Sequence, residues 1–493
     1  MQQLELFDLA LDEIRHYHHP PQRPGFPYVT LNWRFGSGER RMQQKALPVS
    51  RLEWGIRQIA RRPNWQRGHW FISQSEFSHP DRQKVHLWSL GGCWVDIDLK
   101  SPDHDSKTMG HWCSAVLFHC QDLGIPEPTI IVWSGHGLHV KWAFDAPLPA
   151  AALPRWNAVQ RRLHDKMQSV GLPSDPQAID ASRILRIAGT FNAGVPVQVL
   201  HVGRAHNFEV FCEYVLPYSR EQVQQFRESD RLWEEARKTW AAWDENRRAA
   251  AQFLRRATDF SPLQYAAREA AERLHYDRLQ ALRRIAMARG GIQPGKRNEW
   301  CWIVANSAAW GLGDPQNLYR EVVTLMREIA PSYTAAEARS SASSVYARLK
   351  EGRDKLYRLK TSTILERLQI SDDEARQHGL LNAGKLGHGT KNPGAMGLEK
   401  IHGLSFEEYE REVRRRFALG GQYSASIRNE AELKEARSRA AQMAAKAKAQ
   451  ANEDKRASAR LMRAQGLSLR AIAAELGVSH EIVRRWCESI TPA

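Results

Sequence analysis

The chain has 493 residues, 42% of them hydrophobic and 26% charged, which is typical of globular proteins and long enough for about three domains. Its net charge of +16 indicates either a generally basic surface or one that neutralises nucleic-acid phosphates. The six cysteines form no Cys-x-x-Cys pair, and the N-terminus carries acids and no long apolar run. We therefore expect no disulfide scaffold, no signal peptide and no membrane span. The expected location is the reducing cytoplasm.

The first part of the chain alternates strand-like and helix-like segments, which predicts an α+β domain. The expected strands are 93–99, 129–133, 138–144 and 196–202, and the expected helices are 108–123 and 150–170.

Later segments have the patterns of helices, interrupted by a Gly-rich stretch at 382–397 that is typical of a linker. The last thirty or so residues form a separate small unit. The expected organisation is a core at 1–215, a helical connector at 216–289, a small helical domain at 290–380, a Gly-rich linker region at 381–428, a charged helix at 429–457 and a helix-turn-helix unit at 458–493.

Asp96 and Asp98 lie in the first of these strands. Side chains alternate between the two faces of a strand, so both carboxylates project from one face. Paired carboxylates repel each other unless a cation lies between them, and Mg²⁺ or Mn²⁺ prefers such oxygen ligands. The pair is a candidate half of a two-metal site, although two acids on an exposed edge strand would look the same.

A Gly-rich turn, Ser134–His139, joins the next two strands. Gly135 and Gly137 permit a tight turn whose backbone N–H groups can face an anion, and Ser134 adds a hydroxyl. His139 opens the following strand and can donate to a phosphate oxygen. His136, in the middle of the turn, is the weaker candidate. An ordinary hairpin with a structural histidine is the alternative.

The third fragment runs from Asp175 to Asn192 and contains two acids, Asp175 and Asp180. Arg183 and Arg186 are three residues apart and would share a face if the segment were helical. Two guanidinium groups on one face suit triphosphate or template phosphates. A solvent-facing helix with two ion-paired arginines is the alternative.

In this order and spacing, the three fragments resemble the motifs of the archaeo-eukaryotic primase superfamily, most closely its plasmid, phage and integrative-element replication primases. The resemblance covers residues 80–205, and more faintly 290–380, which is similar to the small helical domain that follows such cores. It implies an RRM-like antiparallel sheet with flanking helices, followed by all-α domains. Where many relatives place a Lys soon after the Asn, this chain has Ala193-Gly194-Val195.

The resemblance implies metal ligation by Asp96, Asp98 and Asp175, with Asp180 as the other candidate for the third acid. Asp175 is preferred because the relatives' motif starts with Asp-Pro. It also implies that His139 binds the incoming phosphates, and that Ser134, Gly135, Gly137, Arg183 and Arg186 support nucleotide binding.

The activity implied is primer synthesis on a single-stranded DNA template from NTP or dNTP substrates, with two Mg²⁺ or Mn²⁺ ions. Gly290–Lys296 fits the spacing of a P-loop, but Arg297 stands where Ser or Thr is needed. No fused helicase motor is therefore expected, and unwinding would require a separate replicative helicase.

The C-terminal segment 469–486 has the pattern of a helix-turn-helix unit. Ala473, Gly477 and Val483 have the expected spacing, and Ser479 can cap the second helix. Ser479, His480, Arg484 and Arg485 are the expected contacts to double-stranded DNA. A small helical unit for protein contact is the alternative.

Two other functions remain open. A non-catalytic DNA-binding replication initiator or regulator could retain the primase fold. A rolling-circle nickase would need His-x-His, whereas His136 and His139 are separated by two residues, which disfavours it.

Overall fold

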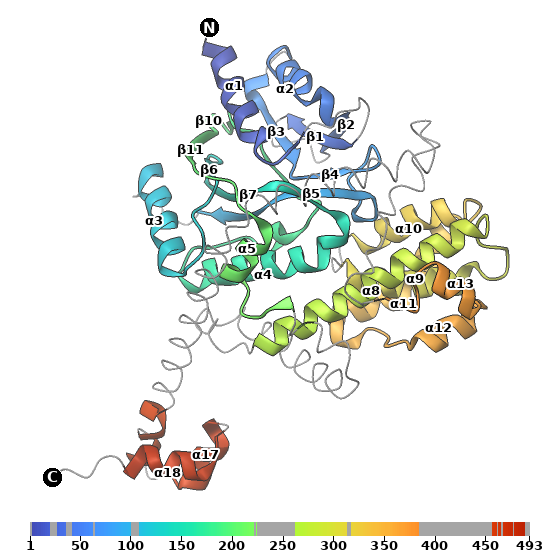
Figure 1. Ribbon diagram of the computed structural model, residues 1–493. Helices are drawn as coiled ribbons and strands as arrows, with labels where there is room; N and C mark the ends of the chain where they lie inside the picture. Colours follow the sequence, from blue (N-terminus) through green and yellow to red (C-terminus); the bar gives the residue numbers. More distant parts are fainter. Residues whose placement is uncertain are drawn as a thin grey trace. The chain divides into compact units, whose positions relative to one another are not determined.

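The computed structural model describes residues 2–19, 27–35, 42–62, 65–99, 108–220, 223, 262–312, 317–383, 456–460, 462–464, 467–476 and 478–488 (Figure 1). The chain divides into two compact units, Met1–Arg428 and Asn429–Ala493. Each is treated separately below. In the described part of the chain, no helix combines the length and apolar character that a membrane crossing requires.

The first unit is built on a nine-stranded sheet in which every neighbouring pair is antiparallel. The strand order is β11-β6-β7-β5-β4-β1-β3-β8, with β2 on β1, and β9 and β10 form a separate small ribbon. The bounds are β1 (Tyr28–Phe35), β2 (Gln43–Pro48), β3 (Gly68–Ser73), β4 (Ser75–Phe77), β5 (Leu87–Asp98), β6 (Ile130–Trp133), β7 (Gly137–Pro149), β8 (Ile184–Arg186), β9 (Phe191–Asn192), β10 (Val195–Pro196) and β11 (Gln198–Val202).

Helices cover both faces of this sheet (Figure 1). Alternation along β6 divides its apolar side chains, so that Ile131 joins one core while Ile130 and Val132 join the other. One face packs against α1 (Gln2–Arg15) and α2 (Leu52–Ala60). The other packs against α3 (Met109–Asp122), α4 (Leu153–Ser169) and α5 (Phe208–Val215). The predicted α+β class, an antiparallel sheet with flanking helices, is confirmed.

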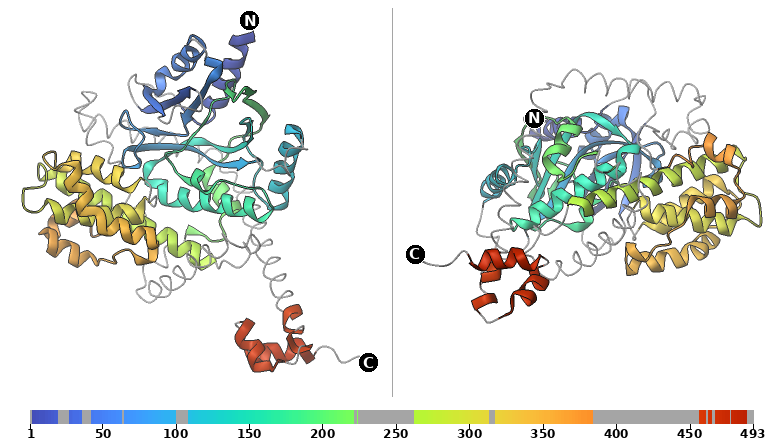
Figure 2. Two further views of the ribbon diagram at one scale, coloured as in Figure 1. Left: turned by 180° about the vertical axis from the view of Figure 1, so that it is seen from behind. Right: turned by 60° about the horizontal axis from the view of Figure 1, so that its bottom comes forward.

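The described residues from 262 to 383 are mainly helical, as predicted, and lie beside the sheet (Figure 2). The α-helices in this part of the chain are α8 (Pro262–Ala288), α9 (Arg297–Gly311), α10 (Leu318–Ile329), α11 (Ala335–Glu351), α12 (Thr361–Leu368) and α13 (Asp372–Gln377). They share one continuous apolar core with the α4 face of the sheet. The Gly-rich linker and the charged helix expected at 429–457 fall almost entirely outside the described residues.

Buried ion pairs join α8 to α4. Arg155 lies 3.0 Å from Glu269, and Arg161 lies 3.0 Å from Glu272, with all four side chains less than a tenth exposed. Buried charges of this kind require opposite partners, because burial of an unpaired charge is strongly unfavourable. The α8 helix therefore completes the packing of the sheet domain.

The second unit contains α17 (Leu469–Leu476) and α18 (His480–Glu488). Ile472, Ala473 and Val483 are buried together with Ala459 in a small core. The N–H of Ile482 donates to Ser479 Oγ at 3.4 Å, consistent with Ser479 capping α18. Gly477, the expected turn residue, lies outside the described residues.

Candidate active site

Strand β5 carries Asp96 and Asp98 to one end of the sheet. Val95 and Ile97 pack into the core beneath, so the two acids project from the opposite face. Asp98, the last residue of the strand, is exposed, whereas the side chain of Asp96 is 21% exposed. Burial raises the pKa of Asp96, and the neighbouring charges of Asp175 and Asp98 raise it further, while Arg183 opposes both effects. The pair thus forms a region in which a cation is favoured.

Asp175 is held against β5 by the backbone. Its N–H donates to the carbonyl of Asp96 at 2.8 Å, and the N–H of Asp98 donates to the carbonyl of Pro173 at 2.9 Å. Ser174 forms an antiparallel bridge with Ile97 between these two bonds. The Asp175 carboxylate also caps the short helix η6 (Pro176–Ile179) by accepting from the N–H of Gln177 at 2.8 Å. The third fragment therefore pairs with the end of β5 that carries the first acids.

One guanidinium nitrogen connects two of the three acids. Arg183 Nη2 donates to Asp96 Oδ2 at 3.1 Å and to Asp175 Oδ2 at 2.8 Å. The ligand oxygens of Asp96, Asp98 and Asp175 do not all lie within 4.8 Å of one another. Arg183 supplies positive charge to Asp96 and Asp175.

Asp180 belongs to a different set of contacts. Its carboxylate lies 3.4 Å from Lys84 Nζ and accepts from the Ser182 N–H at 3.1 Å and hydroxyl at 2.7 Å. Burial would raise the pKa of Asp180, but Lys84 and the hydrogen bonds from Ser182 outweigh burial and lower it. Asp180 therefore resembles a structural carboxylate more than a ligand open to a metal.

The Ser134–His139 turn is fixed by hydrogen bonds within itself and to the third fragment. Ser134 donates through its N–H and its hydroxyl to the carbonyl of Gly137, at 2.8 and 3.2 Å. Asn192 Nδ2 donates to the carbonyl of Ser134 at 2.9 Å. Gly135 has a φ of 98°, and a Cβ there would lie 2.8 Å from the Cβ of Asn192. Asn192, from the third fragment, thus stabilises the Ser134–His139 turn. The sequence pattern did not reveal this role.

His139 lies directly opposite Asp96 in the β5–β7 register, with Nε2 3.8 Å from Asp96 Oδ1. Burial lowers the pKa of His139 well below its usual range, and the charges of Lys141, Arg186 and Arg183 lower it further. The imidazole is therefore neutral near pH 7. Its Nδ1 is buried without a hydrogen-bond partner. His136, in contrast, is exposed.

The expectation that Arg183 and Arg186 share a helical face is wrong, because the segment is extended and forms β8. Arg183 turns to the acids, and Arg186 Nη1 lies 3.1 Å from His69 Nδ1, with its guanidinium 4.7 Å from the centre of the Phe71 ring. Burial and the neighbouring charge of Arg34 together lower the pKa of Arg186 to about 10. Arg34 and His69, paired across β1 and β3, thus join Arg186 in a basic cluster that no sequence motif indicated.

In the second unit, the predicted DNA contacts lie on the outer side of α18. Ser479, His480, Arg484 and Arg485 are all exposed. Arg484 Nη2 donates to Glu481 at 2.7 Å, one turn earlier in the same helix. Arg485 adds a second exposed cation beside it.

No protein-family model matches the chain. A curated protein of Clostridium perfringens called "Replication protein" is 31% identical over 123 residues, which are 25% of this chain and 29% of that protein. The chain therefore matches less than a third of that relative's length.

Solved structures similar to this chain include the AEP domain of the cyanophage S-2L primase-polymerase (16% identity, 42% of this chain and 97% of that chain, TM-score 0.32). They also include the primase RepB' (16% identity, 74% of this chain and 99% of that chain, TM-score 0.30). A third is the catalytic domain of RepB' in complex with initiator DNA (14% identity, 45% of this chain and 100% of that chain, TM-score 0.28). The predicted resemblance to a replication protein is confirmed by the 123-residue match.

Proposed function

We propose that this protein is a DNA primase or primase-polymerase of a mobile genetic element, which synthesises primers on single-stranded DNA by metal-dependent nucleotidyl transfer during replication initiation. The observation that carries the proposal is the backbone pairing of Asp175 with Asp96, which adds a third carboxylate to the end of β5 where Asp96 and Asp98 already project. The Ser134–His139 turn lies beside them, since His139 is the register partner of Asp96.

The acids fit a divalent cation by their chemistry. Asp96 and Asp175 share the positive charge of Arg183, and the pKa of Asp96 is raised by its burial and its acidic neighbours. Hard oxygen ligands of this kind suit Mg²⁺ or Mn²⁺. We propose Asp96, Asp98 and Asp175 as the metal ligands rather than Asp180, whose carboxylate is engaged by Lys84 and Ser182. When bound, such ions would activate a primer 3′-hydroxyl and stabilise the charge of the triphosphate.

The nucleotide phosphates would be bound by groups on the same side of the sheet. Arg186 and its neighbour His69 provide donors. The backbone N–H groups at 135–136 in the turn would add to them, because the Ser134 N–H already donates to the Gly137 carbonyl. A phosphate oxygen is also the proposed partner of His139 Nδ1, which is buried without one. Arg183, now bound to Asp96 and Asp175, would be available to phosphates once a cation neutralises the acids.

The proposed partners are single-stranded template DNA at the first unit and double-stranded DNA at α18 of the second. The exposed Arg484 and Arg485 support the latter. A separate helicase would open the duplex, because the sequence lacks a P-loop with its Ser or Thr.

Template-dependent incorporation of labelled NTPs or dNTPs, with Mg²⁺ or Mn²⁺, tests the proposal directly. We expect primers from the wild-type chain and none from the Asp96→Ala, Asp98→Ala double variant. The matched control is Asp8→Ala, Asp12→Ala, which removes two exposed acids from α1. Full synthesis by the first double variant would refute the proposal.

One observation favours a second candidate, a non-catalytic replication initiator that keeps the fold. Arg183 already neutralises Asp96 and Asp175, so the acids can be stable without a metal. This alternative predicts that the chain binds duplex DNA through α18 and makes no primers under any metal condition.

A further inference from the structure

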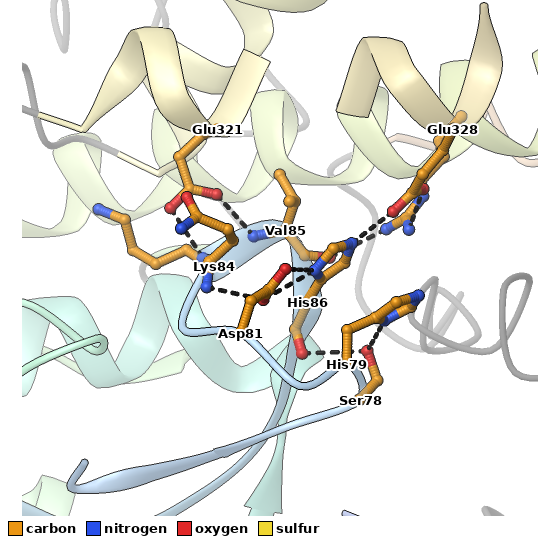
Figure 3. Close-up of polar contacts among 10 residues, drawn as sticks. Ser78, His79, Asp81, Lys84, Val85, His86, Glu321 and Glu328 are labelled. Carbon is orange, nitrogen blue, oxygen red and sulfur yellow. Dashed lines mark hydrogen bonds and ion pairs between the residues drawn. The ribbon is translucent and has the colours of Figure 1, made fainter. Parts of the chain in front are cut away.

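Two polar regions of the first unit, both away from the β5 acids, differ in whether their charges are paired. Where the sheet meets α10, His86 Nδ1 lies 2.8 Å from Asp81 Oδ2, and Nε2 faces Glu328 Oε1 (Figure 3). Burial alone would lower the pKa of His86, but hydrogen bonds to these two carboxylates outweigh burial and raise it to about 9. Glu328 is also paired with Arg283, and the ring of His79 stacks on that of His86. The charges of this junction are therefore satisfied within the protein.

The other region lies on α2 and carries an exposed tryptophan. Trp54 is 51% exposed, and among the Trp side chains that the structure describes it is the one in the exposed class. Large aromatic side chains usually bury most of their surface in a core or at an interface. A single exposed aromatic residue carries little meaning by itself, so the groups around Trp54 decide what it can bind.

The neighbours of Trp54 along the helix form a polar stripe. Arg51 is the N-cap residue of α2 and Arg61 is its C-cap residue, and both are exposed. A spacing of three, four and three positions places four residues on one side of the helix, here called the α2 stripe: Arg51, Trp54, Gln58 and Arg61. At the rise of an α-helix the stripe is about 15 Å long. It is long enough to follow a short stretch of an extended chain.

Strand β2 adds a further cation beside the α2 stripe. Side chains alternate along a strand, so Lys45 and Leu47 of β2 point to the same side. A Cβ on Gly55 would lie 2.3 Å from Leu47 Cδ1, so the lack of a side chain at Gly55 lets α2 lie close to β2. Lys45 Nζ lies 5.8 Å from the centre of the Trp54 ring. The tryptophan is therefore accompanied by cations from two elements.

The acid next to Trp54 points away from the α2 stripe. Glu53 is paired with Arg15 of α1 at 3.1 Å and with Arg57 at 3.2 Å. Arg57 is also paired with Asp8 of α1 at 3.0 Å. These acids are therefore engaged in the contact between α1 and α2, whereas the two arginines of the α2 stripe form no ion pair with any described residue. The stripe keeps an unbalanced positive charge.

We propose that the α2 stripe and Lys45 bind single-stranded DNA, with one base stacked on Trp54 and the adjoining phosphates on the cations. Every base has a flat face that can stack on an aromatic ring, and each nucleotide brings an anion that Arg or Lys can neutralise. A duplex hides the faces of its bases, so the exposed ring favours a single strand. The inference rests on the proposed function for the identity of that strand as the template, but the binding itself needs no metal and no incoming nucleotide.

The experiment measures binding of a fluorescein-labelled oligothymidine to the full-length protein by fluorescence anisotropy, without metal or nucleotide. Unlabelled duplex DNA in excess occupies the second unit. We expect Trp54→Ala to weaken binding roughly 5- to 100-fold, the effect of losing one stacked base. Trp54→Phe should keep most of the affinity, because an aromatic ring remains. Phe118→Ala is the matched control and should bind like the wild type, since Phe118 is a 65% exposed aromatic residue on α3.

The salt dependence of binding tests the two arginines. In the double variant Arg51→Gln, Arg61→Gln, the slope of log affinity against log salt concentration should fall by about 1.4, because two contacts to single-strand phosphates are lost. The control is Arg339→Gln, Arg376→Gln, which removes two exposed arginines from α11 and α13 and should keep the wild-type slope. An equal fall in both double variants would mean that only the net charge matters, which contradicts the proposal.

Photo-cross-linking locates the contact directly. An oligonucleotide that carries iodouracil should attach to Trp54 on irradiation, as identified by mass spectrometry of the digested protein. Wild-type affinity in Trp54→Ala, or equal losses in Trp54→Ala and Phe118→Ala, would overturn the proposal and leave Trp54 and Lys45 as a surface contact only. If the wild type makes no primers while Trp54→Ala loses affinity, the primase proposal fails and the DNA-binding surface stands. If primers form and Trp54→Ala binds normally, the reverse holds.

Discussion

The backbone N–H of Asp175 donates to the backbone carbonyl of Asp96 at 2.8 Å. This bond places the third fragment beside the first through the main chain, so it does not depend on either carboxylate. Substitution of the Asp175 side chain should therefore change the charge of the site while its backbone geometry is kept.

The first prediction separates the two candidates for the third acid. Asp175→Asn should abolish primer synthesis, because a proposed metal ligand is lost, and should leave the free energy of unfolding nearly unchanged. Asp180→Asn should retain synthesis but lower the free energy of unfolding by about 2 kcal/mol, because buried Lys84 loses its carboxylate partner. Primer assays and urea titrations of both variants measure the two effects. The reverse pattern, with synthesis lost only in the Asp180 variant, would make Asp180 the ligand.

The second prediction concerns the close approach of β5 and β7. A Cβ on Gly137 would lie 2.0 Å from the carbonyl oxygen of Ile97, so Gly137→Ala must separate the strands next to Asp98. We expect a loss of stability of about 1–3 kcal/mol and a severe loss of activity. Gly110→Ala is the control, because a Cβ there meets only Thr108 Oγ1 at 4.0 Å and the exposed helical site should gain up to about 1 kcal/mol. Equal thermal stability of the two variants would contradict the prediction.

The third prediction is a pH dependence of stability. Although burial would raise the pKa of Glu272, the charges of Arg161, Arg353 and Arg268 outweigh burial and lower it to about 2. Because the folded pKa lies below the unfolded value of 4.5, the ionised form stabilises the fold by about 3 kcal/mol above pH 4.5. That contribution is lost as the pH falls from 4.5 toward 2.

Urea unfolding of the wild type and Glu272→Gln at several pH values measures this contribution. The difference between the two proteins should be largest at pH 5–7 and fall to less than half by about pH 3. A difference that does not vary with pH would mean that Glu272 acts through its shape and hydrogen bonds alone.

The fourth prediction concerns α18. Arg484→Ala, Arg485→Ala should weaken binding to duplex DNA and reduce the slope of log affinity against log salt concentration by about 2, because two phosphate contacts are lost. Primer synthesis on a short single-stranded template should persist, since it depends on the first unit. Arg470→Ala, an exposed arginine on α17, is the control for net charge. Unchanged salt dependence in the double variant would exclude α18 as the DNA-binding helix.

Local periodicity was enough to predict part of this site. The two-residue repeat placed Asp96 and Asp98 on one face of a strand, and strands at 130–133 and 137–149 lie where the pattern indicated. The arrangement of Arg183 and Arg186 was predicted wrongly, because their spacing fits a helical turn while the pairing of β8 with β3 makes the segment extended. Local spacing cannot show which strand a segment will meet.

Contacts between distant segments were not predictable in the same way. The bond from Asn192 to Ser134 and the cluster of His79 with Glu328 depend on how the sheet and the helices come together. Glu321 on α10, which accepts from the backbone N–H groups of Lys84 and Val85 at 2.8 and 2.9 Å, is a further example. Such residues carry no local pattern of their own.

The pairing of α4 with α8 decides where the chain can be cut for biochemical work. A fragment that stops at residue 215 would contain every proposed catalytic residue, yet it would leave Arg155 and Arg161 with their counter-ions Glu269 and Glu272 removed. Such a fragment would expose two guanidinium groups on an otherwise apolar surface and would tend to aggregate. Because α8 shares its apolar core with the helices that follow, and Glu272 also pairs with the buried Arg353, the shortest dependable expression fragment for the sheet domain should continue through α13.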